Sequence, residues 1–160
     1  MSFFSRLFRV GTLPEPLRAQ LEPEGIIHVA EKVRVRERFS GGVPGRHDAL
    51  GVNRHIGLVV FTRQRLYALL PSLQMLKQPA IDQRWDAPHD GPARVEISDS
   101  GVKLEIVGLQ QVDPRFHGDL SLDFRTSLPD ETLAALPSRS LAFAVSPEYV
   151  FHMLGVRAKP

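Results

Sequence analysis

Residues 26–39 read IIHVAEKVRVRERF, a stretch in which β-branched and charged side chains alternate. Successive side chains of a β-strand point to opposite faces of the sheet, so this alternation predicts a half-buried antiparallel strand. Val33, Val35 and Phe39 fall on one face of that strand. The stretch is longer than a usual strand, and we therefore expect a β-bulge near Ala30 and Glu31.

Shorter strands are predicted along the rest of the chain, at residues 54–62, 66–70, 83–85, 94–98, 102–107, 118–125 and 141–145. The residues DSG at 99–101 separate two alternating runs and predict a hairpin. About seven strands at roughly ten-residue spacing predict a mainly β fold with minor α, a small antiparallel barrel or sandwich. Ser146 and Pro147 are typical helix-start residues, and we expect a C-terminal helix through Leu154 to close the sheet.

A chain of 160 residues has the length of one domain. We expect residues 1–23 to form a helical or irregular N-terminal extension, and residues 24–160 to form a single β domain. Phe3, Phe4 and Leu7 recur at helical spacing in the extension. The extension can therefore either pack on the domain or lie at a membrane interface.

The composition excludes several classes of protein. The chain has no cysteine, which excludes disulfides, thiol catalysis and thiolate zinc sites. No apolar run is long enough to span a bilayer, and the N-terminus lacks the pattern of a signal peptide. We therefore predict a cytoplasmic protein that can contact a membrane peripherally.

Charge is unevenly distributed, although 20 basic and 18 acidic side chains leave a net charge of only +2. Residues 1–65 carry eleven basic and six acidic side chains, whereas residues 66–160 carry nine and twelve. This excess is too small for a nucleic-acid-binding protein, and we expect no nucleic-acid partner. It suffices to attract an anionic group to the first part of the chain.

Residues 57–67, GLVVFTRQRLY, resemble the G-x-hydrophobic-x-hydrophobic-T-x-x-R-L-hydrophobic hairpin of bacterial pleckstrin-homology-like (PH-like) and GRAM-like domains. Residues 24–27, EGII, are similar to the strand start before that hairpin. The resemblance is sharp over residues 24–70 and architectural over 93–155. It implies a PH-like β domain over residues 24–160.

Catalytic and metal-binding motifs are not evident in the sequence. The six histidines have no ligand spacing, and a metal site would need distant loops, such as those of His47 and His89. No G-x-S-x-G elbow nominates a nucleophile. We therefore assign no catalytic residue, no cofactor and no metal ligand, and the sequence favours a protein that is not an enzyme without deciding the point.

Four arginines are candidate ligands for a phosphate or an anionic lipid. Arg36 and Arg38 project, together with Arg34, from one face of the first strand. Arg46 lies on a predicted flexible loop over residues 40–48, and Arg54 begins the second strand. The end of one antiparallel strand faces the start of the next, so we expect Arg36, Arg38 and Arg54 to converge. Guanidinium groups bind phosphate oxygens in a bidentate manner.

The resemblance points to the same arginines. Eukaryotic pleckstrin-homology domains bind inositol phosphates with a basic residue late in the first strand and an arginine early in the second. The positions that match here are Arg36 or Arg38 and Arg54. The alternative is a solvated strand face on which arginines pair with glutamates.

These patterns predict a non-catalytic interaction module. It would bind a protein partner or a second copy of itself through loops or an exposed edge strand, or contact an acidic membrane through loop arginines. The alternative is a small-molecule-binding β-barrel, which could be an enzyme, with Tyr67, Trp85 and Phe116 lining its cavity.

Overall fold

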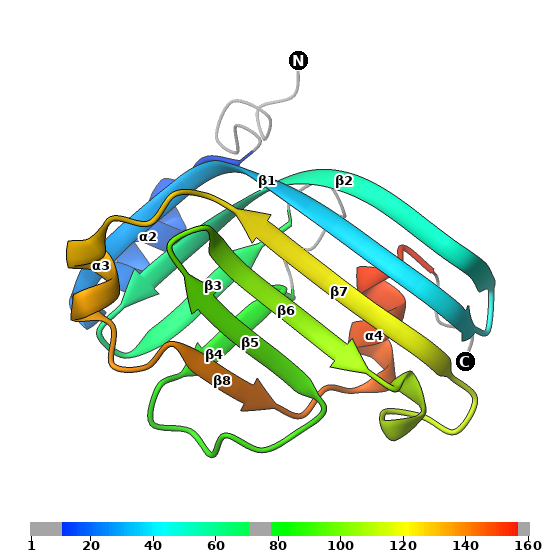
Figure 1. Ribbon diagram of the computed structural model, residues 1–160. Coiled ribbons are helices and arrows are strands. Elements are labelled where there is room, and N and C mark those ends of the chain that lie inside the picture. Colours follow the sequence, from blue (N-terminus) through cyan, green and yellow to red (C-terminus); the bar gives the residue numbers. More distant parts are fainter. Residues whose placement is uncertain (1–10, 71–77, 157–160) are drawn as a thin grey trace.

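One antiparallel sheet of eight strands curls into a nearly closed barrel (Figure 1). The computed structural model describes residues 11–70 and 78–156. The strands are β1 (Ile26–Val43), β2 (Arg46–Thr62), β3 (Arg65–Leu69), β4 (Ile81–Arg84), β5 (Ala93–Ser98), β6 (Gly101–Val107), β7 (His117–Arg125) and β8 (Ser140–Phe143). They pair in the order β4-β3-β2-β1-β7-β6-β5-β8. The predicted mainly β fold is confirmed.

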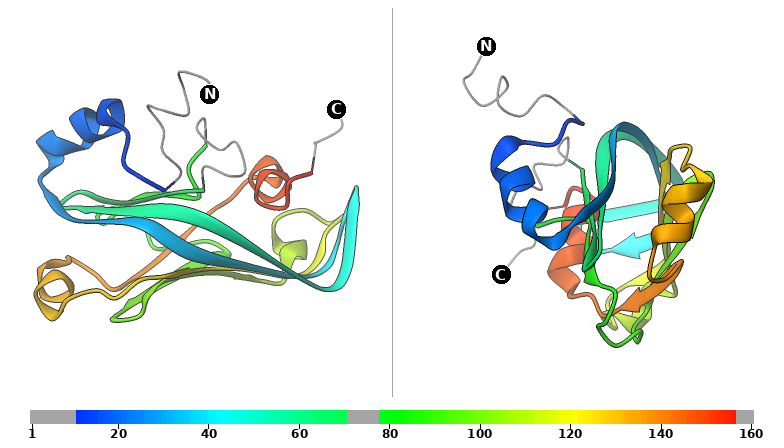
Figure 2. Two further views of the ribbon diagram at one scale, coloured as in Figure 1. Left: turned by 90° about the horizontal axis from the view of Figure 1, so that it is seen from above. Right: turned by 90° about the vertical axis from the view of Figure 1, so that its left-hand side faces the viewer.

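Short helices pack around the barrel. They are α2 (Glu15–Leu21), the 3-10 turns η1 (Glu22–Glu24) and η3 (Leu109–Gln111), α3 (Asp130–Ala135) and α4 (Pro147–Met153). The views in Figures 1 and 2 place α2 and α3 at the same end of the barrel. Leu21 of α2 packs on Leu58, Val60 and Leu69, which lie on the outer face of β2 and β3. The first ten residues of the predicted N-terminal extension, which include Phe3, Phe4 and Leu7, lie outside the described residues.

The terminal helix α4 bridges the two edge strands of the sheet, as the sequence predicted. Its first turn is capped by Ser146, whose Oγ accepts a hydrogen bond from the Tyr149 N–H. The Tyr149 hydroxyl donates a hydrogen bond to the carbonyl of Ala80, beside β4. The same ring meets Phe143 of β8 edge to face, with centroids 6.5 Å apart. Within the described part of the chain, no helix is long and apolar enough to cross a membrane.

The β1–β2 hairpin is much longer than predicted, because the expected flexible loop over residues 40–48 does not form. β1 runs to Val43 and β2 begins at Arg46, so only Pro44 and Gly45 make the turn. Backbone pairing continues through Gly41 and Gly42, where glycine permits close approach to β7. The predicted bulge is confirmed by a shift in register between Ala30 and Val33.

The barrel interior follows the predicted alternation of strand residues. Val95 and Ile97 of β5 and Leu104 and Ile106 of β6 are buried, and they belong to the same cluster as Phe124 of β7. Burying aliphatic and aromatic side chains in this way stabilises the fold by roughly 1.5–3 kcal/mol for each side chain.

Raising the pH above about 10 is expected to destabilise the protein. Burial raises the pKa of Tyr149 far above its ordinary value, and burial followed by the charge of Asp82 raises the pKa of Tyr67. A pKa that is higher in the folded than in the unfolded chain contributes stability at low pH, and this stability is lost once the pH passes the unfolded pKa. Urea unfolding at about pH 8 and about pH 11 should show this loss, and Tyr149→Phe should reduce it. An equal loss in the variant would contradict the assignment to Tyr149.

Candidate functional site

The outer face of β2, β1 and β7 carries a row of arginines. Alternation along β1 places Arg34, Arg36 and Arg38 on this face, because the intervening Val35 and Glu37 are buried. The strand register then aligns further arginines beside this row. Arg36 is the Cα partner of Arg54 on β2, and Arg34 is the partner of Arg125 on β7.

Four of these arginines have no acidic partner within the described part of the chain. Across residues 11–70 and 78–156, no carboxylate lies within ion-pair distance of Arg34, Arg36, Arg38 or Arg54. Arg125 is different, since its Nε lies 3.1 Å from Oδ2 of Asp123. The arginines on this face of β1 are therefore not paired with glutamates among the described residues, in contrast to the alternative considered from the sequence. The four guanidinium groups have hydrogen-bond donors available for an anionic ligand.

A groove of about 670 Å³ lies along the arginine row. It is lined by Arg34, Val35, Arg36, Arg54, His55, Ile56 and Arg125. A second hollow of about 400 Å³ shares Arg36 and Arg125 with this groove. The second hollow is mixed in charge, because Glu105, Asp119 and Asp123 also line it. The basic groove is thus bordered on one side by carboxylates.

Apolar side chains are exposed beside the arginines. Leu50, Val52 and Ile56 of β2 are 61%, 46% and 37% exposed, and they flank Arg54 on the same face of the strand. Exposed aliphatic side chains grouped next to unpaired charges are typical of a surface that binds a partner. We call the surface made by Arg34, Arg36, Arg38, Val52, Arg54 and Ile56 the arginine face.

Arg46, the fourth candidate ligand from the sequence, does not belong to the arginine face. It lies on the core side of the hairpin, where its guanidinium stacks over the ring of Phe39. Its Nε donates to Oδ2 of Asp48 at 2.7 Å and its Nη1 donates to the Leu154 carbonyl at 3.0 Å. The bulge between Phe39 and Gly41 shifts the register of the hairpin. Residues 46–48 therefore do not continue the alternation of faces that the arginine row follows.

Arg46 also approaches a buried carboxylate. Glu37 is 1% exposed, its Oε2 accepts a hydrogen bond from Asn53 Nδ2 at 2.8 Å, and it lies 3.6 Å from Arg46 Nη1. His55 Nε2 lies 3.9 Å from Oε1 of the same carboxylate. These contacts tie the two strands of the hairpin together inside the barrel.

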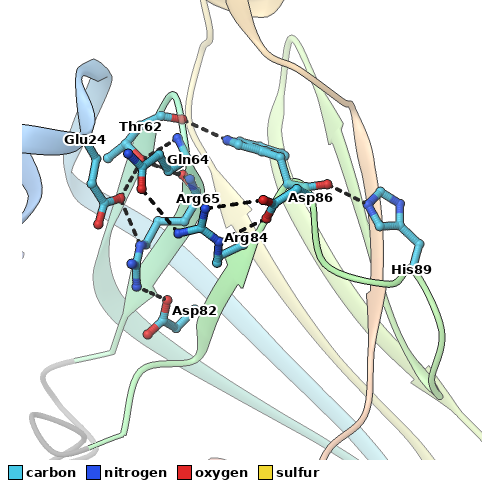
Figure 3. A network of polar contacts seen from close by, with 9 residues as sticks. Glu24, Thr62, Gln64, Arg65, Asp82, Arg84, Asp86 and His89 are labelled. Carbon is cyan, nitrogen blue, oxygen red and sulfur yellow. Dashed lines mark hydrogen bonds and ion pairs between the residues drawn. The ribbon is translucent and has the colours of Figure 1, made fainter.

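The polar network around the β2–β3 turn contains the residues that carry the PH-like resemblance (Figure 3). Thr62 Oγ1 accepts from the backbone N–H groups of Gln64 and Arg65 and donates to Oε1 of Glu24. Arg65 donates from Nε to Glu24 and from Nη1 to Asp82, at 2.9 Å each. Because its guanidinium is already paired twice, Arg65 holds the turn together and is not a candidate ligand.

The three residues of the predicted pocket lie in different places. Phe116 packs edge to face on Phe151 in the main core. Trp85 is buried at the β2–β3 turn, where its Nε1 donates to the Thr62 carbonyl. Tyr67 packs with the cluster under α2, on the outer side of the sheet.

Sequence reasoning named Arg36, Arg38 and Arg54 as candidate ligands and did not name Arg125. The alternation placed Arg34 on the same strand face as Arg36, but Arg34 was not included among the candidate ligands. Arg125 could not be identified, because its place beside Arg34 depends on the pairing of β1 with β7. Comparison with protein-family models, curated proteins and solved structures found no match for this chain. The PH-like and GRAM-like resemblance stays a prediction.

Proposed function

We propose that the protein is a non-catalytic interaction module whose arginine face binds an acidic segment of a partner protein. The observation that carries this proposal is the group of four arginines without acidic partners among the described residues, two of which are directly paired across β1 and β2. The segment would be extended, with alternating carboxylate and aliphatic side chains. A carboxylate would pair with Arg54, and the aliphatic side chains would contact the exposed Val52 and Ile56. Fork-shaped guanidinium groups bind carboxylates in a bidentate manner.

Two features favour a narrow protein segment over a flat membrane. The basic surface is a groove, which a planar bilayer reaches less well than a single extended chain does. Glu105, Asp119 and Asp123 border it, and their charges would repel an anionic bilayer laid across the whole face. The contact with anionic lipid predicted from the sequence is therefore the alternative outcome of the test.

A labelled peptide of alternating Glu and Val residues should bind the full chain, as measured by fluorescence anisotropy. The double variant Arg36→Glu/Arg54→Glu should weaken binding by more than about tenfold, which corresponds to about 1.4 kcal/mol. Binding should also weaken as salt is added, because exposed charges are screened. A peptide with Gln in place of Glu should not bind.

Arg139→Glu is the matched control, because Arg139 is exposed in the loop before β8. It changes the net charge by the same amount per site and should leave peptide binding unchanged. If the wild type binds phosphatidylserine vesicles but not the peptide, and the double variant loses this binding, the arginine face is a lipid site. Failure to bind either probe would overturn the proposal.

A further inference from the structure

His47 and His117 meet over Gly42, near the turn of the β1–β2 hairpin. Gly42 of β1 pairs with His47 of β2 on one side and with His117 of β7 on the other. The two imidazole centroids are 5.6 Å apart, and the ring planes are inclined by 55°. Both side chains are exposed, so the space between them is accessible from solvent.

Nε2 of His117 and Cδ2 of His47 face the space above Gly42. A Cβ atom on Gly42 would lie 2.7 Å from Nε2 of His117 and 2.8 Å from Cδ2 of His47, the carbon bonded to its Nε2. The absence of a side chain at Gly42 is therefore what lets the two imidazole rings approach the same point.

Two further glycines bring the histidines together. Gly41 and Gly118 are Cα partners on β1 and β7, with φ angles of 133° and 97°. A Cβ atom on either would overlap the backbone of the opposite strand. The close approach of the two strands at this point requires glycine on both, and it places His117 beside His47.

We propose that His47 and His117 form a two-histidine site for a divalent transition-metal ion such as Zn²⁺, Ni²⁺ or Cu²⁺. Imidazole nitrogen is a favoured ligand of these ions. Metal–nitrogen bonds of about 2.0–2.1 Å put the centroids of two rings on one ion about 5–6 Å apart, which matches the observed pair.

Water would complete the coordination of this ion. Among the described residues, no group of three or more His, Asp or Glu side chains is placed to hold a metal. The site is thus an open one, with positions left for exchangeable ligands. The histidine pair is separate from the arginines of the arginine face, and the proposal does not depend on the proposed partner.

The full chain should bind a single Ni²⁺ or Zn²⁺ ion in isothermal titration calorimetry. His47→Ala and His117→Ala should each weaken binding by at least about tenfold, since even the loss of a group that only supports a ligand costs that much. Both side chains are exposed, so neither change should unfold the protein. Ni²⁺ should broaden the imidazole NMR signals of His47 and His117 before those of the other histidines.

Two further variants make the test specific. His152→Ala removes an exposed imidazole from α4 and should leave binding unchanged. Gly42→Ala keeps both imidazoles but fills the space between them, and Gly42 has no positive φ that would oppose alanine. It should weaken binding as much as the loss of a histidine. The proposal is overturned if wild type binds no ion, or if all three substitutions at the pair leave the affinity unchanged.

Discussion

Replacing Arg46 by alanine is expected to lower the free energy of unfolding by about 3 kcal/mol, because removing one partner of a buried ion pair leaves a charge without compensation. The charge left behind is the carboxylate of Glu37, which is 1% exposed and lies 3.6 Å from the guanidinium. The change also removes the hydrogen bond to Leu154 and the packing over Phe39. Urea unfolding followed by circular dichroism would measure the loss.

Two comparisons separate this explanation from a general effect of losing an arginine. Arg38→Ala removes an exposed arginine from the same hairpin and should change stability by no more than about 0.5 kcal/mol. The double variant Glu37→Gln/Arg46→Ala should be more stable than Arg46→Ala, because it carries no uncompensated buried charge. If the double variant is as unstable as the single one, packing over Phe39 explains the loss and the charge does not.

Gly118→Ala is expected to cost more than about 3 kcal/mol, since overpacking costs about 1–3 kcal/mol and left-handed backbone about 1–2 kcal/mol for a residue with a Cβ. Gly118 has a φ of 97°, and a Cβ atom there would overlap the carbonyl oxygen of Ser40 on β1. Relief of this overlap requires β7 to move away from β1. Thermal or urea unfolding would measure the loss of stability.

Gly155→Ala is the matched control for the backbone conformation. Gly155 follows α4 with a φ of 68°, and nothing lies within 4 Å of the position that its Cβ would take. Only the conformational cost applies, and the expected loss is about 1 kcal/mol. Equal losses in the two variants would show that the approach of β1 to β7 at Gly118 is not sterically constrained.

The fold class could be predicted from the sequence because strand alternation is a local signal. In the run at 26–39, the alternation of apolar and charged residues predicts which side chains point to the same face of the strand. Val33, Val35 and Phe39 are buried, as that pattern indicates. The DSG hairpin at 99–101 and the cap at Ser146 are likewise encoded within a few residues. The extent of β1 and β2 was underestimated, because glycines at 41 and 42 predict a loop unless the neighbouring strand is known.

The candidate sites depended on contacts that the sequence does not display. The strand alternation alone identified Arg36 and Arg38. It did not show which arginines form ion pairs with a carboxylate, as Arg46 and Arg125 do. Glu37 shows this most clearly, because it lies in a charged run yet is buried, with Asn53 and Arg46 beside its carboxylate. His47 and His117 are seventy residues apart and show no ligand spacing, so only strand pairing brings them together.

The sequence by itself determined that this protein is an antiparallel β fold with a capped terminal helix and a basic first hairpin. Periodicity, turn residues and helix caps act between neighbours, and a reader of the sequence can therefore evaluate them. Only the tertiary structure decided which arginines share a face, which carboxylate is buried and which histidines meet. These outcomes depend on strand order, on register and on a single bulge between Phe39 and Gly41, and a shift of one residue in register would exchange the two faces of the strand.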